Sequence, residues 1–185
     1  MKYIAIVITD MIVGGVEKAL IEMLKRVDHV NYHWTVFTWD EKGALIDLLP
    51  EYVNIRYLKD GADTAKNIIS DAKGLKLFSV LKGLVYRVIM RITKDNYKKQ
   101  IYMEKCKRKI NEKYDCAIAY KLNFSDTSCI CYRMNAKKRC AFLHGNVTRQ
   151  KQITKQFDKC SFYCKMDCIE KIFCVSEDVK KALIY

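Results

Sequence analysis

The stretch YIAIVITDMIVGGVEKALIEML, residues 3–24, decides the fold of this chain. Residues 3–8 form an apolar run rich in β-branched side chains, which is typical of a strand buried on both faces of a parallel sheet. Gly14 and Gly15 follow, and from Val16 onwards apolar residues recur at helical spacing. The pattern predicts a strand, a glycine loop and a helix.

The start of this predicted helix is a candidate anion site. A strand, a glycine loop and a helix present backbone N–H groups to phosphate in many α/β proteins. Gly14 and Gly15 have no Cβ, so a ligand can approach the backbone closely. Glu17 lies in the first turn, where the helix dipole stabilises a carboxylate. An ordinary strand-to-helix turn without a ligand explains these residues equally well, so the stretch alone leaves both alternatives open.

The remaining chain alternates between strand and helix patterns. Strands are predicted at 33–39, 53–58, 116–120, 139–143 and 171–175, with 53–58 near an edge of the sheet. Helices are predicted at 44–49, within 64–112, from a cap at Ser125 or Asp126 to about 133, at 151–167, and after a cap at Ser176. This order predicts an α/β fold, a Rossmann-like and mostly parallel six-stranded sheet with helices on both faces.

The carboxyl ends of the predicted strands are where a ligand is expected. Parallel sheets of this kind bind ligands just beyond those ends. The relevant loops follow the first, fourth and fifth strands, at residues 10–15, 121–126 and 144–149. His144 stands directly after an apolar strand and before a glycine, which favours a functional role over a histidine merely hydrogen-bonded to backbone.

The composition fits one globular domain that spans residues 1–185. Half of the residues are hydrophobic and the chain has a single proline, so no part has the composition of a disordered segment. No segment has the uncharged apolar length of a membrane span, and Asp10 interrupts the apolar start, unlike in a signal peptide. We therefore expect a cytoplasmic protein.

All nine cysteines lie between Cys106 and Cys174, and none belongs to a Cys-x-x-Cys pair. Cys160, Cys164 and Cys168 recur every four residues, but no histidine shares their helical stripe. We expect reduced thiols packed against the sheet, and no metal site. Burial is also expected for the thiols in apolar strand-like runs, Cys116, Cys140 and Cys174.

The net charge of +13 is concentrated in one part of the chain. Residues 73–113 contain thirteen Lys or Arg and three acids. Six of the basic residues share one face of the predicted helix: Lys73, Lys76, Arg87, Arg91, Lys94 and Lys98. A solvated face and attachment to anionic lipid headgroups explain this pattern about equally well. Nucleic acid ranks well behind, because no stacking aromatics alternate with the basic residues.

Three segments together carry a resemblance to a known family. They are GGVEKAL at residues 14–20, FLHGNV at 142–147, and FDKCSFYCKMDCIEKIFCVSEDVKKAL at 157–183. The chain resembles the amino-terminal half of family 4 ("group 1") glycosyltransferases, which have the GT-B fold. Val16 stands where that family often has alanine, and Phe142 where it often has tryptophan. The chain also stops about ten residues into its last predicted helix, so we expect it to be the amino-terminal part of a longer protein.

The resemblance implies a retaining transfer of a sugar from a nucleotide sugar to a glycan or lipid-linked acceptor, as in polysaccharide synthesis. The amino-terminal domain would supply the acceptor site, and a carboxy-terminal domain, absent here, would hold most of the donor. This chain alone would then be inactive. No metal or other cofactor is implied, and the acceptor would suit a protein peripheral on the inner face of the cell membrane.

Roles are also implied for individual residues. His144 would be the catalytic residue, holding the reacting sugar without having to act as a general base, and Gly14 and Gly15 would approach the donor diphosphate. The acceptor or cleft residues would be Val16, Glu17, Asn123, Asn146 and Arg149.

An alternative function is a non-catalytic Rossmann-like module that binds a nucleotide or docks a partner. A dinucleotide-dependent dehydrogenase is a poor version of this alternative, because the first strand is not followed by the Gly-x-Gly-x-x-Gly fingerprint. An enzyme half and a binding module differ in one measurable property, which is turnover of a nucleotide sugar.

Overall fold

The computed structural model describes residues 1–58, 88, 91–92, 101, 104–105, 107, 109–145 and 168–184. The chain divides into two compact units, one of residues Met1–Leu58 with Ile110–Tyr185 and one of residues Lys59–Lys109. The first unit contains every strand of the described sheet. In the second unit, Lys107 pairs with the buried Glu104 at 2.5 Å between Nζ and Oε1.

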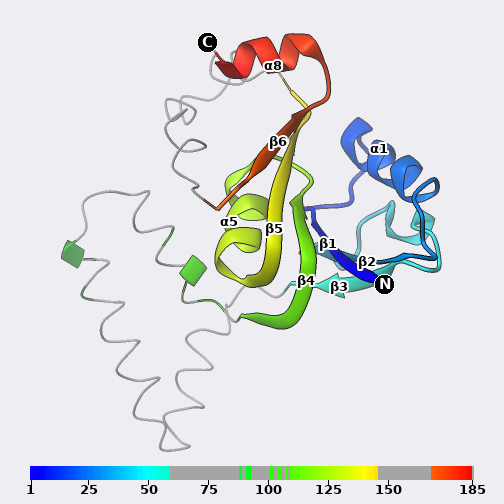
Figure 1. The fold of residues 1–185 in the computed structure, drawn as a ribbon, viewed down its shortest axis with the longest axis horizontal. Helices are drawn as coiled ribbons and strands as arrows, with labels where there is room; N and C mark the ends of the chain where they lie inside the picture. Colours follow the sequence, from blue (N-terminus) through cyan, green and yellow to red (C-terminus); the bar gives the residue numbers. More distant parts are fainter. Residues whose placement is uncertain are drawn as a thin grey trace, which may run out of the picture. The chain divides into compact units, whose positions relative to one another are not determined.

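Six strands form one sheet in the order β3-β2-β1-β4-β5-β6 (Figure 1). They are β1 Lys2–Val7, β2 Tyr32–Thr38, β3 Asn54–Tyr57, β4 Ile110–Ala119, β5 Met134–Leu143 and β6 Lys171–Cys174. All five pairings between these strands are parallel. The predicted Rossmann-like α/β fold is therefore confirmed, and β3 lies at an edge as predicted.

The described helices differ from the predictions at their ends. They are α1 Gly15–Leu24, α5 Phe124–Tyr132, α8 Glu177–Ile184 and the short 3₁₀ turn η1 Ile46–Leu48, which replaces the helix predicted at 44–49. The predicted cap of α5 at Ser125 or Asp126 is wrong, because Asn123 Oδ1 accepts the Asp126 N–H at 2.8 Å. The predicted cap of α8 is confirmed, because Ser176 Oγ accepts the Val179 N–H at 3.2 Å.

Of two further predicted helices, one falls on residues that are only partly described and the other on residues that are not described. Within the range 64–112, residues 88, 91, 92, 101, 104 and 105 are helical, but Ile110 already begins β4. The helix predicted at 151–167 lies outside the described residues.

The apolar residues of the sheet pack into two clusters on its opposite faces. Side chains alternate along a strand, so Val7 of β1 joins one cluster and its neighbour Ile6 joins the other. Ile130 of α5 and Val179 of α8 pack into the cluster of Val7. Leu20 of α1 packs into the cluster of Ile6. The near-continuous apolar run of β1 is explained by this burial on both faces.

The cysteines differ from the expectation of reduced, buried thiols. Cys131 of α5 is disulfide-bonded to Cys168, with a Cα–Cα distance of 5.8 Å, so the expectation is wrong for this pair. Cys129 is buried, whereas Cys116, Cys140 and Cys174 are only half-buried. The other two members of the predicted stripe, Cys160 and Cys164, lie outside the described residues.

Candidate functional site

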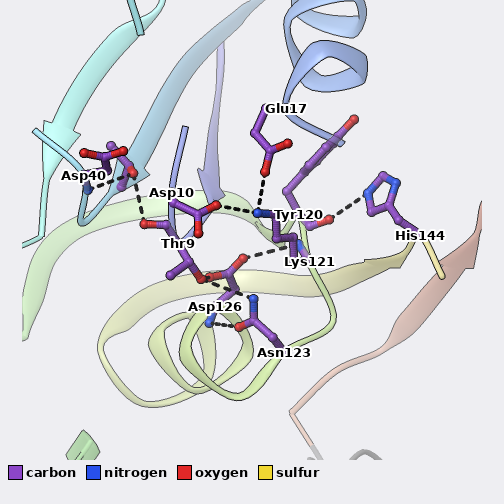
Figure 2. Close-up of polar contacts among 10 residues, drawn as sticks. Thr9, Asp10, Glu17, Asp40, Tyr120, Lys121, Asn123, Asp126 and His144 are labelled. Carbon is purple, nitrogen blue, oxygen red and sulfur yellow. Dashed lines mark hydrogen bonds and ion pairs between the residues drawn. The ribbon is translucent and has the colours of Figure 1, made fainter. Parts of the chain in front are cut away.

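Polar side chains from three chain segments meet at the carboxyl edge of the sheet. The segments follow β1, β4 and β5, which are neighbours in the sheet. Figure 2 shows the side chains of Asp10, Lys121 and His144 at this edge, with their partners. The parallel sheet explains the convergence, because strands that run in one direction end on one side.

Lys121, at the end of β4, carries a positive charge held between two carboxylates. Its Nζ lies 2.6 Å from Asp10 Oδ1 and 2.5 Å from Glu17 Oε1. Burial disfavours the charged form of Lys121, but the hydrogen bonds to Asp10 and Glu17 outweigh this effect and raise its pKa. The three side chains therefore form one ion-paired group that ties the loop after β1 and the first turn of α1 to the end of β4.

Glu17 folds back over the glycine loop. A Cβ placed on Gly14 would clash with Glu17 Oε2, so the Glu17 carboxylate fills the space above this glycine. A Cβ placed on Gly15 would meet nothing within 4 Å. The two glycines thus differ: Gly14 makes room for a side chain of the same protein, and Gly15 leaves its backbone open to a ligand.

Asp126 is a fully buried carboxyl group at the start of α5. It accepts the Thr9 hydroxyl at 2.5 Å and the Lys121 backbone N–H at 3.3 Å. Asn123 Nδ2 in turn donates to Thr9 Oγ1 at 3.2 Å. Burial raises the pKa of Asp126 to about 7, despite these hydrogen bonds. In the sequence, Asp126 is recognisable only as a possible helix cap within the loop 121–126, and no local pattern reveals its contact with Thr9.

His144 is half-buried just beyond the end of β5. Its Nε2 lies 2.8 Å from the Tyr120 carbonyl oxygen, and its ring centroid lies 4.8 Å from that of Tyr120. Because a carbonyl only accepts, Nε2 carries the proton, and Nδ1 is the acceptor nitrogen of the neutral ring. Burial lowers the pKa of His144, which keeps the ring neutral at pH 7. Burial and the nearby charge of Glu17 also raise the pKa of Tyr120 to about 12, so Tyr120 stays neutral.

The other predicted site residues have different surroundings. Val16 is partly buried and packs against the apolar cluster of Ile6. Asn123 uses its side chain for the α5 cap and for Thr9. Asn146 and Arg149 lie outside the described residues.

The predicted basic helix is almost entirely outside the described residues. Of its six basic residues, only Arg91 is described, and it is helical and exposed. Across the described residues, no helix combines the length and the apolar character that a membrane crossing requires.

The described side chains offer hydrogen bonding and charge. Within the described ranges, no three or more His, Cys, Asp or Glu side chains are grouped so that they could hold a metal ion. Among the described residues, the chemical groups at the edge of the sheet include a neutral imidazole, a lysine paired with two carboxylates, the buried carboxyl of Asp126, and the start of a helix. Comparison of the chain with protein-family models, curated proteins and solved structures finds no match.

Proposed function

We propose that this chain is the amino-terminal, acceptor-binding part of a retaining glycosyltransferase that moves a sugar from a nucleotide sugar to a glycan or lipid-linked acceptor. The observation that supports the proposal best is the position of His144. Its neutral ring lies at the carboxyl edge of a parallel sheet, held by the carbonyl of Tyr120, the residue before Lys121. This is the edge at which α/β sheets bind ligands.

The neutral imidazole suits a binding role towards an uncharged sugar. With Nε2 donating to Tyr120, Nδ1 is the nitrogen that can accept a hydrogen bond from a sugar hydroxyl. A hydrogen bond that strengthens as the bond from the sugar to the diphosphate breaks would lower the barrier to transfer. His144 need not remove a proton in this role.

The remaining groups suit the charge of the leaving diphosphate. The backbone of Gly15 is open, and it begins α1, where N–H groups favour a negative charge. Lys121 adds a cation at the same edge, although Asp10 and Glu17 neutralise it in this structure. Most contacts to the nucleotide would come from a carboxy-terminal donor-binding domain, which is the proposed partner of this chain.

The ion pairs of Lys121 support a second candidate, a non-catalytic module that binds a nucleotide or docks a partner. The Glu17 carboxylate fills the space above Gly14 and pairs with the Lys121 ammonium group. Part of the expected anion site is therefore filled by a carboxylate of the protein. In this alternative, Lys121 and Glu17 only join the helix to the sheet.

Turnover separates the two candidates. The full-length gene product would be incubated with a panel of nucleotide sugars and lipid-linked or glycan acceptors, beside the 185-residue chain. The glycosyltransferase proposal expects transfer by the full-length protein only, and at least a tenfold lower kcat for His144→Ala. His33→Ala is the matched control, because His33 is also half-buried but lies near the amino end of β2.

Three results would overturn the proposal. Transfer by the 185-residue chain alone would contradict the division between acceptor and donor domains. Unchanged kcat in a folded His144→Ala protein would remove His144 from the site. Binding of a nucleotide without any transfer, in both forms, would select the second candidate.

A further inference from the structure

Two free cysteines face each other across neighbouring strands, away from the site described above. The Sγ atoms of Cys116 on β4 and Cys140 on β5 lie 3.8 Å apart, and both side chains are half-buried. In the sheet, Cys116 is paired with Lys138, and Cys140 is paired with Ile118. The two cysteines are therefore diagonal neighbours, and their side chains lie on the same face of the sheet.

The diagonal register disfavours a direct bond between the two sulfur atoms. Neighbouring strands lie about 4.8 Å apart and rise about 3.3 Å per residue, so residues offset by two positions across a parallel pair have Cα atoms about 8 Å apart. A disulfide requires a Cα–Cα distance of about 4.4–6.8 Å, a range that includes the 5.8 Å of Cys131 and Cys168. Cys116 and Cys140 can thus bring their sulfur atoms close together, but bonding them would require the strands to move.

The same separation suits one ion held between two sulfur atoms. With metal–sulfur bonds of about 2.3 Å, as in zinc thiolates, two sulfur atoms that share an ion lie up to about 4.6 Å apart. The 3.8 Å between Cys116 Sγ and Cys140 Sγ falls within this limit. Two thiolates with no third ligand among the residues that the structure describes suit a soft ion that accepts low coordination, and thiolate ligands favour Cu(I).

The charges around the pair favour a site that carries a negative charge. Lys138 is paired in the sheet with Cys116, and Lys171 with Cys140, so two exposed lysines lie on the same face as the sulfur atoms. Glu170 adds one nearby negative charge. A Cu(I) ion bound to two thiolates has a net charge of −1, and the two lysines exceed the charge of Glu170 by one.

We propose that Cys116 and Cys140 form a two-thiolate site for a single soft monovalent metal ion, Cu(I). Binding forms two metal–sulfur bonds and releases the two thiol protons to solvent. No electron is transferred and no sulfur–sulfur bond is made. The site does not depend on the proposed glycosyltransferase function.

The test is an anaerobic titration of the full chain with Cu(I) in competition with a chromogenic Cu(I) chelator. Wild type would be compared with Cys116→Ser and Cys140→Ser. Cys174→Ser is the matched control, because Cys174 is also a free, half-buried thiol but packs against the cluster on the other face of the sheet. The remaining cysteines are the same in all four proteins, so any Cu(I) that they bind cancels in the comparison.

We expect Cys116→Ser and Cys140→Ser each to lose one equivalent of chelator-resistant Cu(I), while Cys174→Ser keeps it. X-ray absorption of the loaded wild type should show two sulfur neighbours for that equivalent. Equal stoichiometry in all four proteins would overturn the proposal. So would a peptide linking Cys116 to Cys140 through a disulfide after mild oxidation of the metal-free chain, because it would show that the strands do allow the direct bond.

Discussion

Glu17 in the first turn of α1 and Lys121 at the end of β4 form an ion pair of 2.5 Å, although only 4% of the Glu17 side chain is exposed. Lys121 is more accessible, with 24% of its side chain exposed, and Asp10 shares its charge. Removing one partner of such a pair leaves the other charge buried without compensation. The pair therefore couples the start of the helix to the edge of the sheet.

Lys121→Met should destabilise the protein by about 3 kcal/mol, because it leaves the Glu17 carboxylate buried and unpaired. The double variant Lys121→Met/Glu17→Gln should regain most of this loss. Urea unfolding at pH 7 measures both values. A loss below about 1 kcal/mol in the single variant would mean that water compensates Glu17 fully.

Gly14→Ala and Gly15→Ala should have opposite effects. A Cβ at Gly14 must displace Glu17 from its position, which we expect to cost about 1–2 kcal/mol of unfolding free energy through loss of the ion pair. A Cβ at Gly15 meets no atom and restricts the unfolded chain, so this change should stabilise the protein by up to about 1 kcal/mol. Thermal unfolding of the two variants compares them directly.

The glycine pair also provides a functional control. In a Glu17→Ala background, Gly14→Ala should become nearly neutral, because the clashing carboxylate is gone. If a diphosphate approaches the backbone of Gly15, Gly15→Ala should reduce transfer by the full-length protein without reducing its stability. A stable Gly15→Ala protein with an unchanged rate of transfer would show that the diphosphate does not lie against the backbone of Gly15.

Asp126 should make stability fall as pH rises towards neutrality. Its pKa is about 7 in the folded protein, above the ordinary aspartate value of about 3.8, so the folded state binds its proton more tightly than the unfolded state does. The contribution of Asp126 to the unfolding free energy is fully present below pH 4. It is lost as the pH rises through 7, with a slope of at most about 1.4 kcal/mol per pH unit. Asp126→Asn, which mimics the neutral carboxyl, removes this dependence.

Urea unfolding of wild type and Asp126→Asn at pH 5 and pH 8 isolates the effect from that of other titrating groups. The difference in unfolding free energy between the two proteins should shift in favour of Asp126→Asn at pH 8. The same difference at both pH values would place the folded-state pKa of Asp126 below this window and contradict the prediction.

Reduction of the disulfide between Cys131 and Cys168 should destabilise the protein. The bond spans a sequence separation of 37 residues, for which the chain-entropy relation gives about 4 kcal/mol. The measurement is urea unfolding with and without a strong reductant. The unfolding free energy of Cys131→Ser/Cys168→Ser should match that of the reduced wild type and should not change with the reductant. If the reductant destabilised this double variant as much as the wild type, the effect would belong to other cysteines.

The sequence predicted the features that depend on burial and chain direction. The apolar run at residues 3–8 corresponds to β1 Lys2–Val7, because a strand covered on both faces has no polar positions. The starts of β4 and β5 were predicted too late. Their first residues include the exposed Lys113 and Asn135, which pair with each other in the sheet without being part of the core.

The features that the sequence did not predict are contacts between residues that are distant along the chain. Asn123, Ser125 and Asp126 are all good helix caps by residue type, and the choice among them depends on where β4 ends. The contact of Asp126 with Thr9 joins residues 117 positions apart, and no spacing rule finds it. Nine cysteines likewise allow many pairings, so the partner of Cys131 could not be read from the sequence.

The place of β1 at the centre of the sheet has a consequence for how the chain folds. β1 pairs with β2 early in the sequence, but its other neighbour is β4, and the Tyr3 N–H donates to an Asp115 carboxylate oxygen 112 residues further along. Closing so long a loop loses much chain entropy before any contact is gained, and chains with such distant pairings fold slowly. The second edge of β1 is therefore covered only once the chain has been made as far as β4, and Asp115 follows Tyr3 by 112 residues.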